Sequence, residues 1–241
     1  MNSMTVLGPR TNTCRALVLA SSLALPFGLG LGATAVEAQA PASSCGSSTF
    51  PATGQKTSFP PTLKLTDAPV RDDGLVRAGG ALSYQNNGDG TITDLNTGLM
   101  WEQKIRDIDG GEGLHHVGRV FPWDSAAPTI WDWLEGVNTE GGTGLGGHND
   151  WRIPNVKELQ SIVDYGTFSP SVDVAFNNGP GIDPCSVAEC SLTASGDYWS
   201  ATTFASNLAV AWIVNFDGGN VDVDNKSGTN FVRAVRGGCV P

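Results

Sequence analysis

The sequence predicts an α+β fold, in which a few helices accompany antiparallel strands. Short β-prone runs that follow closely spaced turn signals occur both early and late in the chain. Two segments with helical signals lie between these strand regions. Because strands and helices occur in separate blocks rather than in strict alternation, we expect antiparallel pairing of the strands.

The first strands are expected within residues 84–101. The Asn-Gly and Asp-Gly pairs at 87–90 tolerate the positive φ angles of tight hairpins. Residues 91–93 favour a strand, and residues 96–98 turn the chain again. Residues 105–120 contain glycines and mixed charges without apolar periodicity, so we expect a loop there.

Two helices are expected in the middle of the chain. The first should begin with Asp124 or Ser125 as its N-cap and run to about Asn138. The second should begin after Asn155, because Glu158 follows three residues later and the two side chains can form a capping box.

The remaining strands are expected from residue 198 onward. Residues 209–216 are apolar and β-prone, and residues 217–220 form a turn signal. Valine alternates with aspartate at 221–224, which indicates a half-exposed strand. A last strand is expected at 231–235.

The first forty residues predict a signal peptide. Arg10 and Arg15 precede an apolar run at 16–32, and the small-x-small segment 38–40 is a cleavage signal. An uncleaved membrane anchor is the alternative, but the apolar run is short and interrupted. We therefore expect an exported protein, periplasmic or extracellular, without a membrane span after cleavage.

Three parts of the chain are expected. The signal peptide occupies 1–40, an extended lead-in packed on the domain occupies 41–78, and the domain itself occupies 79–241. The formal net charge of −10 disfavours nonspecific binding to nucleic acid, anionic lipid or sulfated polysaccharide. Ordinary solubility of an exported protein accounts for this charge.

The cysteines support export. Cys14 leaves with the signal peptide, and an even number remains, which suggests two disulfides in an oxidising compartment. Three pairings are possible, of which we favour Cys185–Cys190 and Cys45–Cys239. A zinc site is the alternative, but the cysteine spacing differs from CxxC and no histidine is close in sequence.

A calcium site is a weaker possibility in the first hairpin. With Gly90 at the sixth position of an EF-hand-like loop, Asn87, Asp89 and Thr91 fall at ligand positions. Only one of these is charged, and Asn96 replaces the glutamate expected at the twelfth position. Turn formation explains the same residues, so no cofactor is expected, with calcium as the alternative.

Several segments together resemble the Lcl C-terminal domain family. These segments are NGDGTITDLNTGLMW (87–101), HNDWRIPNVKELQSIVDY (148–165), YWSATT (198–203), AWIVNFDGG (211–219) and VRAVRGG (232–238). The resemblance implies a C-type-lectin-like fold with a small twisted antiparallel sheet, two helices and long irregular loops. It implies a fold more firmly than an activity.

The resulting functional expectation is an exported noncatalytic binding module of adhesion type, with a polysaccharide or a cell-surface protein as its partner. One alternative is an enzyme resembling formylglycine-generating enzymes, which share the broader fold and require a reactive cysteine pair. Another is a structural envelope protein without a small-molecule ligand. The chain has no GxSxG motif to single out a nucleophilic serine.

Candidate ligand contacts lie mainly in the irregular loops, because a rigid scaffold usually presents recognition residues there. Trp131 and Trp133 are two positions apart on a helix, so both cannot face the core, and Trp133 is expected to be the exposed one. The candidates are Asp107, Asp109, His115, His116, Trp133, His148 and Asn149. Three arginines in the family-like segments, Arg152, Arg233 and Arg236, are expected to form buried ion pairs with Asp150, Glu158 or Asp164, with ligand contact as the alternative.

Overall fold

A computed structural model of the protein describes five stretches of the chain: residues 50–58, 71–106, 113–125, 127–179 and 191–237. All of them belong to one unit, Pro41–Pro241. The signal-peptide segment and the four cysteines of the expected disulfides, Cys45, Cys185, Cys190 and Cys239, lie outside the described residues. Cleavage and both pairings therefore stay predictions.

The first sheet contains the predicted hairpin region. Its order is β1-β2-β3-β9, and every neighbouring pair is antiparallel. The strands are β1 (Tyr84–Asn86), β2 (Thr91–Asp94), β3 (Leu99–Glu102) and β9 (Val235–Gly237). Between β2 and β3, the Asp94 carboxylate accepts hydrogen bonds from the backbone of Asn96 and the hydroxyl of Thr97. The turn is therefore stabilised by its own side chains, as Asx residues at this position favour.

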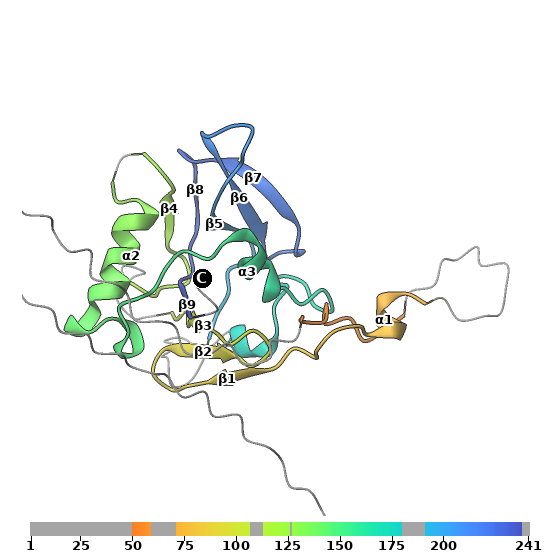
Figure 1. The fold of residues 1–241 in the computed structure, drawn as a ribbon. Helices are drawn as coiled ribbons and strands as arrows, with labels where there is room; N and C mark the ends of the chain where they lie inside the picture. Colours follow the sequence, from red (N-terminus) through yellow and green to blue (C-terminus); the bar gives the residue numbers. More distant parts are fainter. Residues whose placement is uncertain (1–49, 59–70, 107–112, 126, 180–190, 238–241) are drawn as a thin grey trace, which may run out of the picture. The chain divides into compact units, whose positions relative to one another are not determined.

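The second sheet contains the later strands and has the order β4-β8-β5-β6-β7. These strands are β4 (Val120–Pro122), β5 (Asp197–Thr203), β6 (Val210–Asn215), β7 (Val221–Asn225) and β8 (Thr229–Phe231) (Figure 1). Pairing is antiparallel except between β5 and β8, which run parallel. The predicted α+β class is confirmed: the described chain is mostly sheet, with two open sheets and few helices.

One strand prediction was wrong, and the end of one predicted loop was misplaced by a single residue. The run 231–235 was expected to be one strand, but β8 ends at Phe231 and β9 begins at Val235, in different sheets. The three residues between them, 232–234, are buried and carry the chain from one sheet to the other. The loop expected at 105–120 already contains the start of β4, whose pairing with β8 depends on residues about 110 positions away.

The helices begin at capping residues. Helix α3 (Val156–Ser161) has the predicted capping box, because Asn155 accepts from the backbone of Glu158, whose carboxylate accepts from the backbone of Asn155. Helix α2 (Ile130–Thr139) begins later than expected, after Thr129, which forms its own capping box with Asp132.

The expected start of α2 at Asp124 or Ser125 was wrong, since Pro128 precedes the true N-cap rather than occupying the first turn. A four-residue helix, α1 (Asp73–Val76), also interrupts the lead-in that was expected to be extended. Short 3₁₀ turns complete the secondary structure: η1 (Glu140–Gly142), η2 (Leu145–Gly147) and η3 (Val174–Phe176).

The lead-in contacts the domain at two points. Pro51 forms a parallel bridge with Gly80, and the backbone N–H of Tyr165 donates to the carbonyl of Thr53. Gly54 lies so close to the Asp164 carboxylate that a Cβ at this position would be 1.9 Å from Oδ1. The positive φ of +87° at Gly54 also favours glycine.

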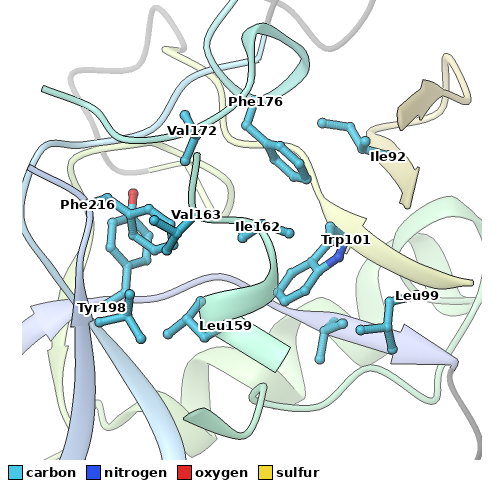
Figure 2. Packing of buried hydrophobic residues seen from close by; sticks show 12 residues of the cluster. Ile92, Leu99, Trp101, Leu159, Ile162, Val163, Val172, Phe176, Tyr198 and Phe216 are labelled. Atoms are coloured by element: carbon cyan, nitrogen blue, oxygen red, sulfur yellow. The ribbon is translucent and has the colours of Figure 1, made fainter. Parts of the chain in front are cut away.

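The apolar core consists mainly of two clusters on opposite faces of the second sheet, and a small third cluster surrounds Leu192. Tyr198 and Trp199 are adjacent in β5 and point to opposite faces, so they belong to different clusters. One cluster packs α3 against both sheets and includes Trp101 and Phe176 (Figure 2). The other packs around Trp133 of α2. Complete burial of each large side chain contributes on the order of 2–3 kcal/mol before entropy is counted.

Of the four tryptophans in the family-like segments, Trp101, Trp151 and Trp199 are buried. The fourth, Trp212, is only partly buried and meets the edge of Phe204 at a centroid distance of 5.5 Å. Among the described residues, no helix reaches the length and apolar character that crossing a bilayer requires.

Candidate functional site

The junction of the two sheets holds a buried ionic network. Glu102, at the end of β3, is completely buried, and its Oε1 accepts from Lys104 Nζ and from His115 Nδ1, both at 2.7 Å. The other ring nitrogen of His115 lies 2.9 Å from a carboxylate oxygen of Glu140 at the start of η1. The Glu102 Oε2 atom accepts from the backbone N–H of Ala234 at 2.9 Å.

Arg233 joins this network to neighbouring backbone segments of the same chain. It is 1% exposed, and its guanidinium donates to the carbonyl of Glu102 at 3.1 Å and to that of Leu192 at 2.7 Å. It also donates to the Thr193 hydroxyl at 2.9 Å, and it lies over the ring of Phe176. Arg233 therefore connects β3, the crossing segment 232–234 and the segment that begins at Ser191.

The mutual contacts shift the acid–base properties of the network. Burial alone would raise the pKa of Glu102, but Lys104 and His115 outweigh burial and hold this pKa at about 2. Burial opposes the charged form of His115, yet its hydrogen bonds to Glu102 and Glu140 raise its pKa to about 9. Burial lowers the pKa of Lys104 to about 8, although Glu102 partly opposes this shift.

At neutral pH the network thus consists of a carboxylate between an ammonium and an imidazolium. Lys104 also lies over the ring of Trp133, 4.5 Å from its centroid. Each charged group is directed at another protein group, so the arrangement is suited to holding the two sheets together. A catalytic acid or base would instead need to reach a substrate atom within hydrogen-bonding distance.

The pH dependence of stability should report on His115. Its folded pKa of about 9 exceeds its ordinary value of 6.5, so its stabilising contribution is complete below pH 6.5 and declines as pH rises toward 9. Above about pH 8, deprotonation of Lys104 has the opposite effect on stability. The free energy of unfolding measured with urea should therefore decline between pH 6.5 and 8, by up to about 1 kcal/mol per pH unit.

His115→Gln should abolish this decline, whereas His116→Gln should retain it. A wild-type unfolding free energy that is constant from pH 6.5 to 8 would contradict the charged state assigned to His115.

A cleft of about 350 Å³ lies beside the network. Leu192 and Thr193, whose oxygen atoms hold Arg233, form part of its wall. The remaining lining is both polar and apolar: Arg106, Val117, Gly118, Ser169, Pro170, Asn177, Ala194 and Phe231. Such a cleft offers hydrogen-bonding groups beside an aromatic ring, which suits a polar ligand with an apolar face.

Comparison with known proteins identifies the family. The model of the Lcl C-terminal domain matches residues 90–236, which is more than half of the chain. The chain belongs to the Lcl C-terminal domain family. A comparison with curated proteins finds no match. The Lcl C-terminal domain match includes Glu102, Lys104, His115 and Arg233, and it includes every residue that lines the cleft.

The predicted contact residues of this Lcl C-terminal domain occupy different environments. Asp107 and Asp109 lie outside the described residues. His115 is buried in the network, and the ring of the partly exposed His116 accepts from the backbone of Gly118. Ligand contact by these four residues stays a prediction. In the structure, both ring nitrogens of His115 are hydrogen-bonded to carboxylates.

Trp133 corrects an expectation. It was predicted to be exposed and available for stacking, but only 3% of it is exposed and its indole N–H donates to the Leu114 carbonyl. Trp131 is the exposed member of the pair, at 40%. His148 is partly exposed after η2, and Asn149 is exposed beside it. Ligand contact by these two residues stays a prediction.

The residues of the candidate calcium site form a hydrogen-bonded turn. The Thr91 hydroxyl donates to Asp89 at 2.6 Å, and the Asn87 amide donates to the hydroxyl of Thr91 at 2.8 Å. These contacts supply the side-chain oxygens with protein partners. Among the described residues, no group of three or more His, Cys, Asp or Glu side chains is placed to hold a metal ion.

The predicted pairing is confirmed for two of the three arginines, although neither ion pair is buried. Arg152 pairs with Glu158 through both guanidinium ends, and Arg236 pairs with Asp150. Arg233 differs, because its partners are carbonyls and a hydroxyl rather than a carboxylate. Sequence reasoning also missed Glu102 and Lys104. Their i, i+2 spacing at the end of a strand was the only local signal.

Proposed function

We propose that the protein is an exported, noncatalytic binding module with a C-type-lectin-like fold, and that it binds a glycan in the cleft lined by Asn177 and Phe231. The observation that carries this proposal is the cleft itself, which combines hydrogen-bonding side chains, Arg106 and Asn177 among them, with an aromatic ring on a rigid support. A polysaccharide of a cell surface presents both hydroxyl groups and apolar faces, so it matches this lining.

The arrangement of the sheets supports the fold assignment. Short antiparallel strands, two flanking helices and long irregular connections are the features that the family resemblance implied. The irregular connections supply most of the cleft, including Val117, Ser169 and Thr193. Loops on a rigid scaffold are a common location for recognition.

The charge pairing supports a noncatalytic role. In the described part of the chain, three groups with clearly shifted pKa values lie together in the Glu102 network. These groups are Glu102, Lys104 and His115, and they contact one another rather than an open site. An enzyme resembling formylglycine-generating enzymes would need a reactive cysteine pair, whereas we assign the cysteines to structural disulfides. Export follows from the N-terminal signal, and the proposed binding requires no cofactor.

A glycan array tests the proposal. The mature chain, 41–241, should bind at least one glycan, and binding should persist in EDTA because no calcium is required. Arg106→Ala and Asn177→Ala should weaken that binding about tenfold, which corresponds to ~1.4 kcal/mol.

Lys157→Ala removes an exposed cation from α3 and should bind like wild type. Failure of wild type to bind any glycan, with the fold intact, would favour the alternative of a structural envelope protein. Binding that is lost in EDTA would instead support calcium-dependent recognition.

A further inference from the structure

Helix α2 presents one tryptophan to solvent. Residues two positions apart on a helix point about 200° apart, so burial of Trp133 directs Trp131 outward. Trp131 is 40% exposed, although it lies one residue after the buried Ile130 in the first turn of a capped helix. The exposed ring is therefore attached to a well-ordered backbone.

A second tryptophan, Trp123, packs against this ring. Trp123 meets Trp131 edge to face, with a centroid distance of 4.9 Å and an interplanar angle of 90°. The Trp123 indole N–H donates to the Ser200 carbonyl at 3.0 Å. Lys226 Nζ lies 3.8 Å from the Trp123 ring centroid and donates to the Thr203 hydroxyl.

These contacts hold Trp123 from two directions and so restrict the movement of Trp131. A rigid aromatic side chain loses little conformational entropy when it binds a ligand. Trp131 therefore has the preorganisation that a stacking residue requires.

The surrounding surface is polar and carries exposed carboxylates, Asp124 and Asp132. The carbonyl of Lys226 accepts from the backbone of Trp123 and Asp124, and its N–H donates to Ala209, so three segments meet at this end of the second sheet. The connections between β5 and β6 and between β7 and β8 lie at the same end (Figure 1). The exposed residues of these connections include Ser206, Asn207, Leu208 and Ser227, and the adjoining strand ends add the exposed Asn225 and Thr229.

Among the described residues of this surface, no cationic side chain is available to an anionic ligand. Within residues 120–132, 203–209 and 224–230, Lys226 is the only lysine or arginine. It is 9% exposed and its ammonium is engaged by Trp123 and Thr203. The exposed Asp124 adds negative charge. A sulfated chain would find repulsion here rather than a counter-charge.

We propose that Trp131 and its surroundings form a second binding site, which takes a neutral polysaccharide. The indole face would pack against the apolar C–H face of a sugar ring, and the neighbouring Asn, Ser and Thr side chains would bond its hydroxyl groups. This inference rests on the proposed glycan-binding function, but it adds a site at a different place from the cleft and specifies an uncharged ligand.

Affinity electrophoresis of the mature chain tests this site. The gels contain dextran, galactomannan or hydroxyethyl cellulose as neutral polymers, and dextran sulfate as the charged counterpart of dextran. Wild type should be retarded by at least one neutral polymer and not by dextran sulfate. Trp131→Ala should weaken the retardation about tenfold, which is a loss of ~1.4 kcal/mol.

Two further variants serve as comparisons. Trp131→Phe retains an aromatic face and should bind more tightly than Trp131→Ala. Phe50→Ala removes an aromatic side chain that is 86% exposed outside this surface, so it should behave like wild type. Thermal unfolding of each variant separates lost binding from lost folding, since the melting temperatures should agree.

The outcomes distinguish this site from the cleft. Neutral-polymer binding that survives Trp131→Ala but is weakened by Asn177→Ala overturns the second site and leaves the proposed function in place. Retardation by dextran sulfate alone also overturns the neutral site. If wild type binds no polymer and no glycan on the array, both proposals fail. A protein partner that requires Trp131, without any glycan binding, would reassign the surface to protein recognition.

Discussion

Replacement of Glu102 with glutamine should destabilise the protein by about 3–5 kcal/mol, the cost typical of breaking a buried ion pair from one side. The amide would keep the shape of the side chain but leave Lys104 and His115 as buried cations without their shared carboxylate. The expected result is a lower midpoint in urea, with an unchanged dependence on urea concentration.

Two comparison variants identify the cause. Glu102→Gln combined with Lys104→Met removes both members of the pair, and it should recover part of the lost stability because no buried ammonium remains. Glu158→Gln breaks the more exposed pair with Arg152, and it should cost about 1 kcal/mol or less. A cost below ~1 kcal/mol for Glu102→Gln would show that the network contributes little.

Replacement of Arg233 with methionine should cost about 3 kcal/mol, because at least two buried acceptors lose their donor and each unpaired group costs about 1–3 kcal/mol. The affected acceptors are the carbonyls of Glu102 and Leu192, which lie on different segments of the chain. Hydrogen exchange should become faster in β3 and near Leu192, where the guanidinium joins the two segments.

Arg236→Met is the matched control. Its pairing with the half-exposed Asp150 lies at the surface, so its loss should change stability by about 1 kcal/mol or less. Unchanged exchange rates near Leu192 in Arg233→Met would contradict the connecting role of this arginine.

Elements stabilised by near neighbours could be predicted from sequence. The capping box of α3 depends on Asn155 and Glu158, three positions apart, and the structure has both hydrogen bonds. The turn before β3 likewise depends on Asp94, whose carboxylate accepts from the backbone of Asn96 and the hydroxyl of Thr97, two and three positions later. In both cases the donor and acceptor are local, so their spacing is visible in the chain.

The orientation of α2 could not be predicted in the same way. Helical periodicity shows that Trp131 and Trp133 face different directions, but it does not say which direction leads to the core. That depends on the position of the second sheet and of Leu114, which accepts the Trp133 indole N–H. The break between β8 and β9 was hidden for a related reason, since the short, mainly apolar run 231–235 is compatible with one strand or with a crossing between sheets.

The sequence by itself determined the family, the α+β class, the first hairpin and the capped start of α3, because these depend on ordered motifs or on interactions among neighbouring residues. Tertiary structure alone decided the pairing of Glu102 with His115 and Ala234, the cleft, and the exposure of Trp131. The Glu102–Ala234 contact joins residues 132 positions apart. Such contacts follow from how the two sheets pack, and no local spacing encodes the burial that makes each charge require a partner.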